Sequence, residues 1–305
     1  MRYASLDSRK PQFAGHETFP LRLLWLKKAY DAVKDGAGLR TFQEPSAIAA
    51  FGVGRNMAQS MRYWALAAGM IEERDGQLWP TELGRLLLDD DGLDPYLETS
   101  ATVWLTHWGL ASTPQMTTTT YFAFNIFQSL EFDPAVLAAE LFALAEARAW
   151  RASAMTIKRD VEVLLRGYVR KTSGSLEDAA EPLLAELGLI REIRSGHFEF
   201  VRGAKPSLPD AVFALALMDF WHSTAPSASS LSAEQVCYLP GSPGRVFKLD
   251  EDSVATKLMA MGSLTDGKLR WTDTAGLRQI QKAGNFDPLP RLIEAYGVRA
   301  SRAAA

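Results

Sequence analysis

The hydrophobic and polar positions of the chain follow a pattern that recurs. The segment LAAGMIEERDGQLWPTELGRLLL begins at Leu66, and the segment MAMGSLTDGKLRWTDTAGLRQI begins at Met259. Both are interpreted as the end of a helix, a glycine, a short strand, an Asp-Gly turn, a second strand, a tryptophan and a Thr-capped helix. A weaker copy, LLAELGLIREIRSGHFEFVRG, begins at Leu183. The pattern predicts antiparallel hairpins near residues 70–79, 189–201 and 263–271.

Residue types at the turns support this interpretation. A glycine stands where each helix is expected to end in a left-handed conformation, namely Gly69, Gly188 and Gly262. Favoured hairpin turns need positive φ at two central residues, which suits Asp75-Gly76, Asp266-Gly267 and, in the weaker copy, Ser195-Gly196. Thr81 and Thr274 are placed to cap the helix that follows.

The copy at Leu66 has a further part before it. Pro45–Ala50 is interpreted as a short helix, residues 51–54 (FGVG) as a tight turn, and Arg55–Ala68 as the next helix. This order predicts a helix-turn-helix followed by a wing. The helices before the other two copies lack a clear turn and a polar face. For those copies we favour a wing that serves packing or dimerisation.

The helix Arg55–Ala68 is the candidate recognition helix. Its apolar positions recur at helical spacing and are expected to face the core: Met57, Met61, Trp64, Ala65 and Ala68. Its polar side carries no acid and consists of Arg55, Asn56, Gln59 and Arg62. Arginine pairs with guanine, and asparagine or glutamine with adenine, through two hydrogen bonds. These side chains are therefore candidate DNA contacts.

The stretch FAGHETFPLRLLWLKKAYD, from Phe13, places His16 and Glu17 before a helix expected to begin near Leu21. The His-Glu pair has three open interpretations: a metal site, an acid/base pair, or a cap that pins the chain, and the cap is favoured. Leu23, Leu24 and Leu26 are expected in the core. Lys27 and Lys28 are expected to be exposed and to contact DNA phosphates.

Two further helical segments carry candidate chemistry. In DPYLE, Asp94 and Glu98 are four residues apart and are expected to share a helix face. In TVWLTHWGL, Trp104, His107 and Trp108 are also expected on one face, where a packed core histidine is favoured over a ligand. Together with His16 and Glu17, these residues include the types that bind Mg²⁺ or Mn²⁺, although no spacing is a specific metal motif.

The segment 153–170 is predicted to be an amphipathic helix with a basic side. Its apolar stripe consists of Ile157, Val161, Leu164, Leu165 and Tyr168. Arg159, Arg166 and Arg170 lie opposite and could follow a DNA backbone. Asp160 falls at the edge of the stripe. It is therefore expected to be partly buried and to need a cation, a metal or a donor, and a structural salt bridge is favoured.

Composition adds limits to this picture. The formal net charge is −3, yet residues 1–40 carry eight basic and four acidic residues, and residues 151–171 carry six and two. DNA binding needs local positive potential of this kind rather than a basic chain. The single cysteine, Cys237, fits a reducing compartment and excludes an internal disulfide. Without an apolar signal core or a membrane-length apolar run, the protein is expected to be cytoplasmic.

The predicted fold is therefore mainly α with small antiparallel β-wings, an α+β class of repeated winged-helix units joined by a helical middle. The expected boundaries are an N-terminal winged-helix DNA-binding domain at 1–110 and a helical middle with a second winged-helix-like unit at 111–225. A C-terminal winged-helix-like unit is expected at 226–305.

The stretches FAGHETFPLR, GVGRNMAQSMRYW, LDPYLE with VWLTHW, and IKRDVEVLLRGY together resemble the bacterial domain-of-unknown-function 4007 family. The resemblance covers about residues 10 to 290. Members of the family occur with DNA phosphorothioation genes, and the chain resembles the SspB-type branch, described as a DNA nickase. The resemblance implies double-stranded DNA as substrate. It also implies, as partners, a cysteine desulfurase, an ATP pyrophosphatase and an ATPase, and it assigns no catalytic residue.

Three functions stay open: a DNA-nicking enzyme, a non-catalytic DNA-recognition subunit, and a winged-helix transcription regulator. Repeated wings and the helical middle favour the first two, and the absence of an HNH or PD…ExK pattern keeps the second. For strand hydrolysis, metal ions held by carboxylates supply an activated water and charge stabilisation. The candidate catalytic acids are Glu17, Asp94 and Asp160, and the candidate ligands are His16, Glu17 and Asp94. A homodimer is a further alternative.

Overall fold

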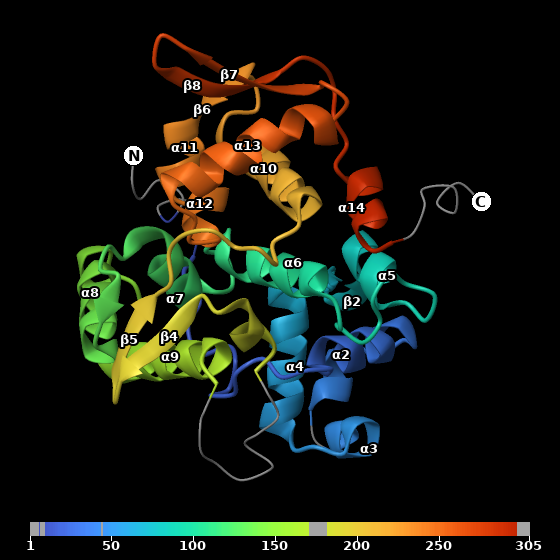
Figure 1. Ribbon diagram of the computed structural model, residues 1–305. Coiled ribbons are helices and arrows are strands. Elements are labelled where there is room, and N and C mark those ends of the chain that lie inside the picture. The colour runs from blue at the N-terminus through green and yellow to red at the C-terminus, as the bar shows by residue number, and fades with distance from the viewer. Residues whose placement is uncertain (1–5, 7–9, 44, 171–181, 298–305) are drawn as a thin grey trace.

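The computed structural model describes Leu6 and residues 10–43, 45–170 and 182–297. Helices dominate it, and short strands follow them along the chain (Figure 1). The α-helices are α2 (Trp25–Lys34), α3 (Ser46–Phe51), α4 (Arg55–Ala67), α5 (Glu82–Leu88), α6 (Ser100–Ala111), α7 (Thr118–Tyr121), α8 (Pro134–Ala147), α9 (Ala154–Tyr168), α10 (Asp210–Thr224), α11 (Ala233–Tyr238), α12 (Pro243–Val246), α13 (Glu251–Leu264) and α14 (Leu289–Ala295). Short 3₁₀ turns η1 (Leu39–Phe42) and η3 (Leu183–Leu187) and a π-helical turn η2 (Phe122–Ile126) lie between them.

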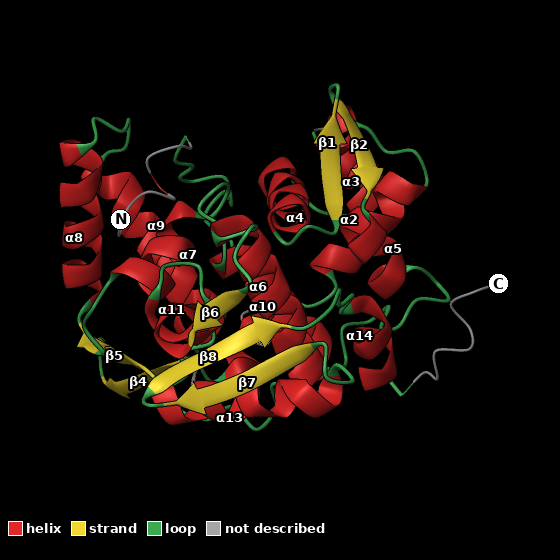
Figure 2. Ribbon diagram, turned by 90° about the horizontal axis from the view of Figure 1, so that it is seen from above, coloured by secondary structure: helices red, strands yellow, loops and turns green. Residues whose placement is uncertain are grey.

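The strands form three small antiparallel sheets in the described residues, and Figure 2 shows the β1–β2 hairpin well apart from the other two. Strands β1 (Ile71–Arg74) and β2 (Gln77–Pro80) make a two-stranded hairpin. The second sheet has the order β3-β5-β4, and the third has the order β6-β8-β7. Their strands are β3 (Glu131–Phe132), β4 (Ile190–Arg194), β5 (His197–Phe200), β6 (Ser230–Ser232), β7 (Leu269–Thr274) and β8 (Leu277–Lys282). The prediction of a mainly helical α+β fold with small antiparallel sheets is confirmed.

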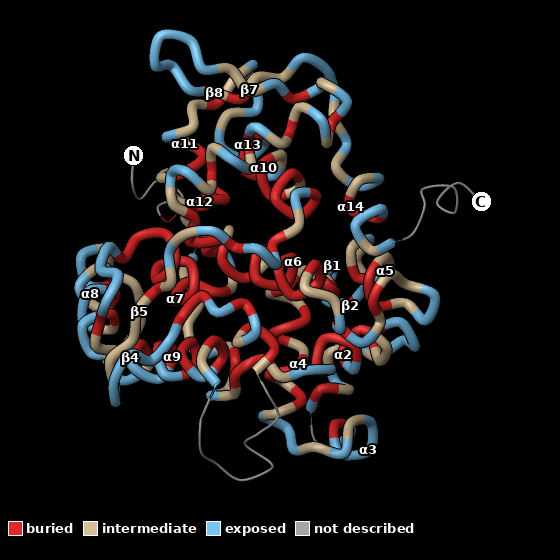
Figure 3. Tube along the Cα trace, viewed as in Figure 1, coloured by how far each residue is buried: buried red, intermediate tan, exposed pale blue. Residues whose placement is uncertain are grey.

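Helix α6 lies at the centre of the molecule, and its surroundings are buried (Figure 3). Ten of its twelve residues are buried, so it is enclosed on all sides rather than amphipathic. A Cβ at Gly109 would lie 3.0 Å from the carbonyl oxygen of Ala68, so α6 packs closely against the end of α4. The helix that carries the Trp-His-Trp sequence is therefore a core element. No helix in the described part of the chain is long and apolar enough to cross a membrane.

The first predicted unit has the expected element order. Helix α3 ends at Gly52, which is left-handed with φ 66°, and α4 begins three residues later. Asp75 and Gly76 join β1 to β2 with φ values of 52° and 73°, which match the favoured hairpin turn. Thr81 caps α5 by accepting a hydrogen bond of 2.9 Å from the Gly84 amide.

The third predicted hairpin is in the wrong register. Gly262 lies inside α13, and Asp266-Gly267 connect α13 to β7 instead of closing a hairpin. The hairpin turn falls at Ala275 and Gly276, so Thr274 ends β7 and caps no helix. The prediction failed because the strand Leu269–Thr274 continues through Trp271, where the repeat implied that a helix would follow.

Two local expectations, at the start of α2 and before α6, were also wrong. Helix α2 begins at Trp25, and Leu23 and Leu24 are 47% and 37% exposed, whereas Leu26 is fully buried. Residues 94–98 are not helical, because Leu97 is left-handed with φ 57° and α6 begins only at Ser100. Asp94 and Glu98 therefore share no helix face.

Candidate nucleic-acid interface and the junction behind it

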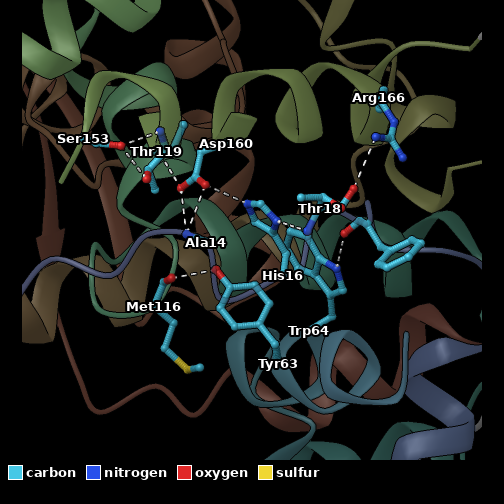
Figure 4. Close-up of polar contacts among 12 residues, drawn as sticks. Ala14, His16, Thr18, Tyr63, Trp64, Met116, Thr119, Ser153, Asp160 and Arg166 are labelled. Atoms are coloured by element: carbon cyan, nitrogen blue, oxygen red, sulfur yellow. Dashed lines mark hydrogen bonds and ion pairs between the residues drawn. The ribbon is translucent and has the colours of Figure 1, made fainter. Parts of the chain in front are cut away.

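Residues 12–20, which we call the N-terminal strap, lie between α4 and α9 (Figure 4). Backbone groups hold the strap at several points along its length. The amide of Gln12 donates to Thr118 Oγ1 (2.9 Å), and the amide of Ala14 donates to Asp160 Oδ1 (3.0 Å). The carbonyl of Thr18 accepts from Arg166 Nη1 (3.2 Å), and the carbonyl of Phe19 accepts from Trp64 Nε1 (3.0 Å).

His16 is the side chain at the centre of this junction. Its ring stacks on Trp64, with 6.0 Å between centroids and 14° between planes, and the residue is 5% exposed. Nδ1 accepts a hydrogen bond of 3.2 Å from the Thr18 amide, which places a proton on Nε2. Nε2 lies 3.1 Å from Asp160 Oδ1. Nδ1 is therefore hydrogen-bonded, whereas the contact of Nε2 with Asp160 is an ion-pair distance without hydrogen-bond geometry.

Asp160, from α9, is the acceptor for several of these groups. Besides His16, its oxygens receive the Ala14 amide and the hydroxyl of Thr119 (3.2 Å to Oδ2). The residue is 5% exposed, so these donors offset the cost of burying a carboxylate. Burial, followed by the charge of Asp160, raises the pKa of the neighbouring Tyr63. His16 therefore anchors the strap to α9. Asp160, for which a structural salt bridge was favoured from the sequence, is partnered by His16 together with backbone and hydroxyl donors.

The strap follows a path that constrains its own residues. A Cβ on Gly15 would lie 2.4 Å from the Tyr63 ring, so only glycine fits at this approach. Glu17 and Thr18 are left-handed, with φ of 47° and 68°, in a region that most side chains disfavour. Glu17 is half-buried, and its carboxylate forms no hydrogen bond or ion pair within the described residues.

Asp94 belongs to a different part of the fold. Its carboxylate accepts from the amides of Glu98 (2.8 Å) and Thr99 (3.0 Å) and from the hydroxyls of Thr99 and Thr102. It shares no partner with His16 or Asp160, so His16, Glu17 and Asp94 do not form the predicted metal site. Among the residues that the structure describes, no group of three His, Cys, Asp or Glu side chains is placed to hold a metal.

His107 is a core residue, as favoured from the sequence. Its Nδ1 lies 2.7 Å from the Tyr168 hydroxyl, and its Nε2 lies 2.8 Å from the Val246 carbonyl. Burial lowers the pKa of His107 to about 3, so the ring is neutral near pH 7. Trp104 and Trp108 are buried beside it.

The polar face of α4 is the accessible part of this region. Arg55 and Asn56 are exposed in its first turn, and Gln59 and Arg62 are half-buried further along the helix. Met61, Trp64, Ala65 and Ala68 are buried, as predicted, whereas Met57 is only half-buried. Arg62 Nε is buried and has no hydrogen-bond partner within the described residues.

On α9, the basic side faces solvent as predicted. Arg159 and Arg166 on α9 are exposed, as is Arg170, which lies two residues past its end. The five residues of the apolar stripe are buried. Lys28 is exposed, but Lys27 is only 8% exposed, and its Nζ lies 2.7 Å from Asp31 and 3.2 Å from Asp90. Burial opposes the charged form of Lys27, yet these two carboxylates outweigh it and raise its pKa. The prediction that Lys27 is exposed is wrong, because the helix turns its ammonium toward these acids.

Sequence reasoning missed the residues that complete the junction: Tyr63, Met116, Thr118 and Thr119. Thr118 accepts from the strap amide of Gln12, 106 residues away, and Thr119 donates to Asp160, 41 residues away. The Tyr63 hydroxyl donates to the Met116 carbonyl, 53 residues away. Local patterns do not report such pairings.

A family model described as a protein of unknown function, DUF4007, matches residues 13–296. The chain belongs to the DUF4007 family. Two SspB crystal structures are similar to this family member, each with 30% sequence identity. One, a magnesium ion-bound SspB, has a TM-score of 0.88 and aligns over 99% of this chain and 92% of its own. The other has a TM-score of 0.86 and aligns over 98% and 92%. No curated protein matches the chain.

Proposed function

We propose that this DUF4007 protein is the DNA-binding and strand-nicking component of a DNA phosphorothioation system. The similarity to SspB over nearly the whole chain supports the assignment to such a system. In this proposal the nick opens one strand so that sulfur can replace a phosphate oxygen. Its partners would be a cysteine desulfurase, an ATP pyrophosphatase and an ATPase.

The observation that carries DNA binding is the face of α4. A short helix, a left-handed Gly52 and a second helix with a following hairpin are the parts of a winged helix. We interpret α4 as the recognition helix, because Arg55 and Asn56 are exposed at its N-terminal end, where such helices meet base edges.

The basic side of α9 supplies a second candidate contact. Arg159 and Arg166 are exposed, and Arg166 also donates to the strap carbonyl of Thr18. The strap therefore links the recognition helix to a helix whose charges suit phosphates. In this proposal α4 reads sequence, while Arg159, Arg166 and Lys28 hold the backbone.

Of the three acids named for catalysis, Glu17 is the strongest candidate. Asp94 and Asp160 are buried and committed to backbone and hydroxyl donors. Glu17 is half-buried on the strap between the two basic helices, and it could take a proton from an attacking water. Among the described residues, no group of three His, Cys, Asp or Glu side chains is placed to hold Mg²⁺ or Mn²⁺. No step is therefore assigned to a metal.

The test is plasmid nicking. Pure protein is incubated with supercoiled plasmid, with and without Mg²⁺ or Mn²⁺, and open-circular product is measured. Glu17→Gln should lower the rate by about 100-fold or more, with Asp287→Asn, an exposed acid before α14, as the matched control. Full activity of Glu17→Gln would show that Glu17 is not catalytic.

A second candidate function is a DNA-recognition subunit without catalysis. The burial of His16, Asp94 and Asp160 favours it, since three residues expected in an active site act as structural anchors. If wild type binds duplex DNA but yields no open circles under any of these conditions, this second function replaces the first.

A further inference from the structure

A cavity of about 400 Å³ lies on the other side of α6, between α8, the π-turn η2 and the loop from α11 to α12. Figure 1 shows α8 and α7 beside α11 and α12, segments about a hundred residues apart in sequence. The volume of this cavity falls in the range of small-molecule sites. None of the residues proposed above for DNA reading or nicking lines it.

The walls of the cavity combine aromatic and polar groups. Phe122 and Tyr238 supply rings, and Arg245, Gln128 and Glu140 supply polar side chains. The guanidinium carbons of Arg202 and Arg245 lie 5.5 and 6.0 Å from the centroid of the Tyr238 ring, and Arg245 Nε donates to the Tyr238 carbonyl at 3.1 Å. Glu140 is the one acid among the described lining residues, and it is exposed on α8.

Buried hydrogen bonds hold the wall formed by η2 in place. Asn125 fixes it on both sides, donating to the Ala111 carbonyl (2.8 Å) and accepting from the Gly241 amide (2.8 Å). From behind, Lys248 Nζ donates to the Phe124 carbonyl at 2.8 Å. Single π-turns of this kind are frequent at functional sites. The cavity is therefore held open by buried hydrogen bonds.

We propose that this cavity binds a single unpaired nucleotide, with its base stacked against the aromatic wall and its phosphate near Arg245. Aromatic rings stack on any base, and arginine suits a phosphate. Glu140 can accept from an exocyclic amino group, as acids do from cytosine, so a base with an amino group is preferred over thymine. The nucleotide comes either from a strand of nucleic acid or from the free pool.

Isothermal titration calorimetry of the full chain separates these sources. The ligands are dCMP, dTMP and a twelve-residue single strand of dC. Wild type should bind dCMP or the dC strand at least tenfold more tightly than dTMP. Binding of dCMP identifies a free nucleotide as sufficient, and binding of the strand alone identifies a strand nucleotide. The absence of binding to both overturns the proposal.

Two variants tie binding to the cavity. Ala143 lines it from an exposed position on α8, so Ala143→Trp should fill it and reduce binding at least tenfold without disturbing the core. Ala135→Trp, exposed two turns earlier on α8, is the matched control and should bind as wild type. Glu140→Gln should reduce the preference for dCMP over dTMP. Unchanged binding in Ala143→Trp would place the ligand elsewhere.

The outcome is independent of the proposed duplex reading by α4. Ala143→Trp should bind duplex DNA with wild-type affinity in a gel-shift assay, because the cavity is remote from the α4 face. A loss of nucleotide binding with intact duplex binding therefore supports this inference alone. Loss of duplex binding in α4 variants tests the proposed function alone.

Discussion

The segments 46–88 and 251–282 contain the similar stretches 66–88 and 259–280, yet the two segments have different structures. In the first, Asp75-Gly76 close a hairpin and Gly84 lies in α5. In the second, the corresponding Asp266-Gly267 connect a helix to a strand, and Gly276 closes the hairpin. Both segments carry the Asp-Gly pair and the later glycine. In the second segment, however, the hairpin begins about one strand later in the pattern than in the first. Asp-Gly thus specifies a local reversal of the chain, and tertiary packing decides which elements it joins.

The two glycines at equivalent places, each five residues after a tryptophan, separate the segments most clearly. A Cβ on Gly84 would lie 2.0 Å from the Met70 carbonyl oxygen and 3.1 Å from the Tyr30 ring. The Met70 carbonyl is a backbone group and cannot move aside without displacing the chain. Gly84→Ala should therefore lower the free energy of unfolding by about 3 kcal/mol or more. At Gly276 nothing lies within 4 Å, and φ is 82°. Gly276→Ala should cost about 1 kcal/mol, from the left-handed conformation alone.

Urea denaturation followed by circular dichroism measures both changes. Similar losses for the two variants would mean that the close contact of α5 with Met70 is relieved by a small shift. In that case the two segments would be energetically alike, and the register difference would carry no stability consequence.

The sequence could predict the first segment because its signals are local. The left-handed Gly52 and Gly69, the Asp-Gly turn and the Thr81 cap each act over a few residues. It could not predict the third hairpin, because β8 also pairs with β6, some fifty residues earlier in the chain. Leu231 and Ile280 pair in that sheet and are both buried, which fixes the register of β8 and hence of β7.

The second prediction concerns DNA binding. In the first segment, Arg55→Ala or Arg62→Ala should each weaken binding of a specific duplex by about 1–3 kcal/mol, because each removes a proposed base contact. In the second segment, Arg270 is also exposed, but its Nε donates to the carbonyl of Gly267, in the turn between α13 and β7. Arg270→Ala should therefore bind the duplex as wild type. Fluorescence anisotropy at fixed salt measures all three variants.

An equal loss in the Arg270 variant would mean that both hairpin units contact DNA. Wild-type binding by both α4 variants would place the recognition surface elsewhere. Lys28→Ala serves as a non-specific reference, since a phosphate contact lowers affinity for every sequence and flattens the salt dependence.

The third prediction compares the two threonines. Thr81 Oγ1 accepts from the Gly84 amide and donates to the Gly69 carbonyl at 2.6 Å, so it joins the end of β2 to α5 and to the turn after α4. Thr81→Ala should cost about 1–2 kcal/mol, the usual worth of a helix cap with one further bond. Thr274 is exposed at the end of β7. Thr274→Ala should stay within about 0.5 kcal/mol of wild type, and a larger thermal shift would contradict the observed register.

The candidate site was predictable in part, and the limit has a physical cause. Asp160 and His16 were each singled out from residue type and position, but their contact joins helix α9 to a loop 144 residues earlier. The contacts of His16 anchor the strap, in line with the favoured interpretation as a pin, whereas the role of Glu17 stays a prediction. Asp94 does not join His16 and Glu17, because its carboxylate is bonded within its own loop, through Thr99 and Thr102.

The smallest expected effect concerns the turn residues that the two hairpins use. Asp75 and Ala275 both precede the turn glycine and are both left-handed, with φ of 52° and 53°. Aspartate and asparagine tolerate this conformation because their side chains bond locally, whereas alanine has no such compensation. Ala275→Asn should therefore raise the free energy of unfolding by about 0.5 kcal/mol, while Asp75→Asn should leave it nearly unchanged. Thermal denaturation of both variants tests this difference. A stabilisation at position 75 but not at 275 would mean that the C-terminal turn is limited by its neighbours rather than by its own backbone.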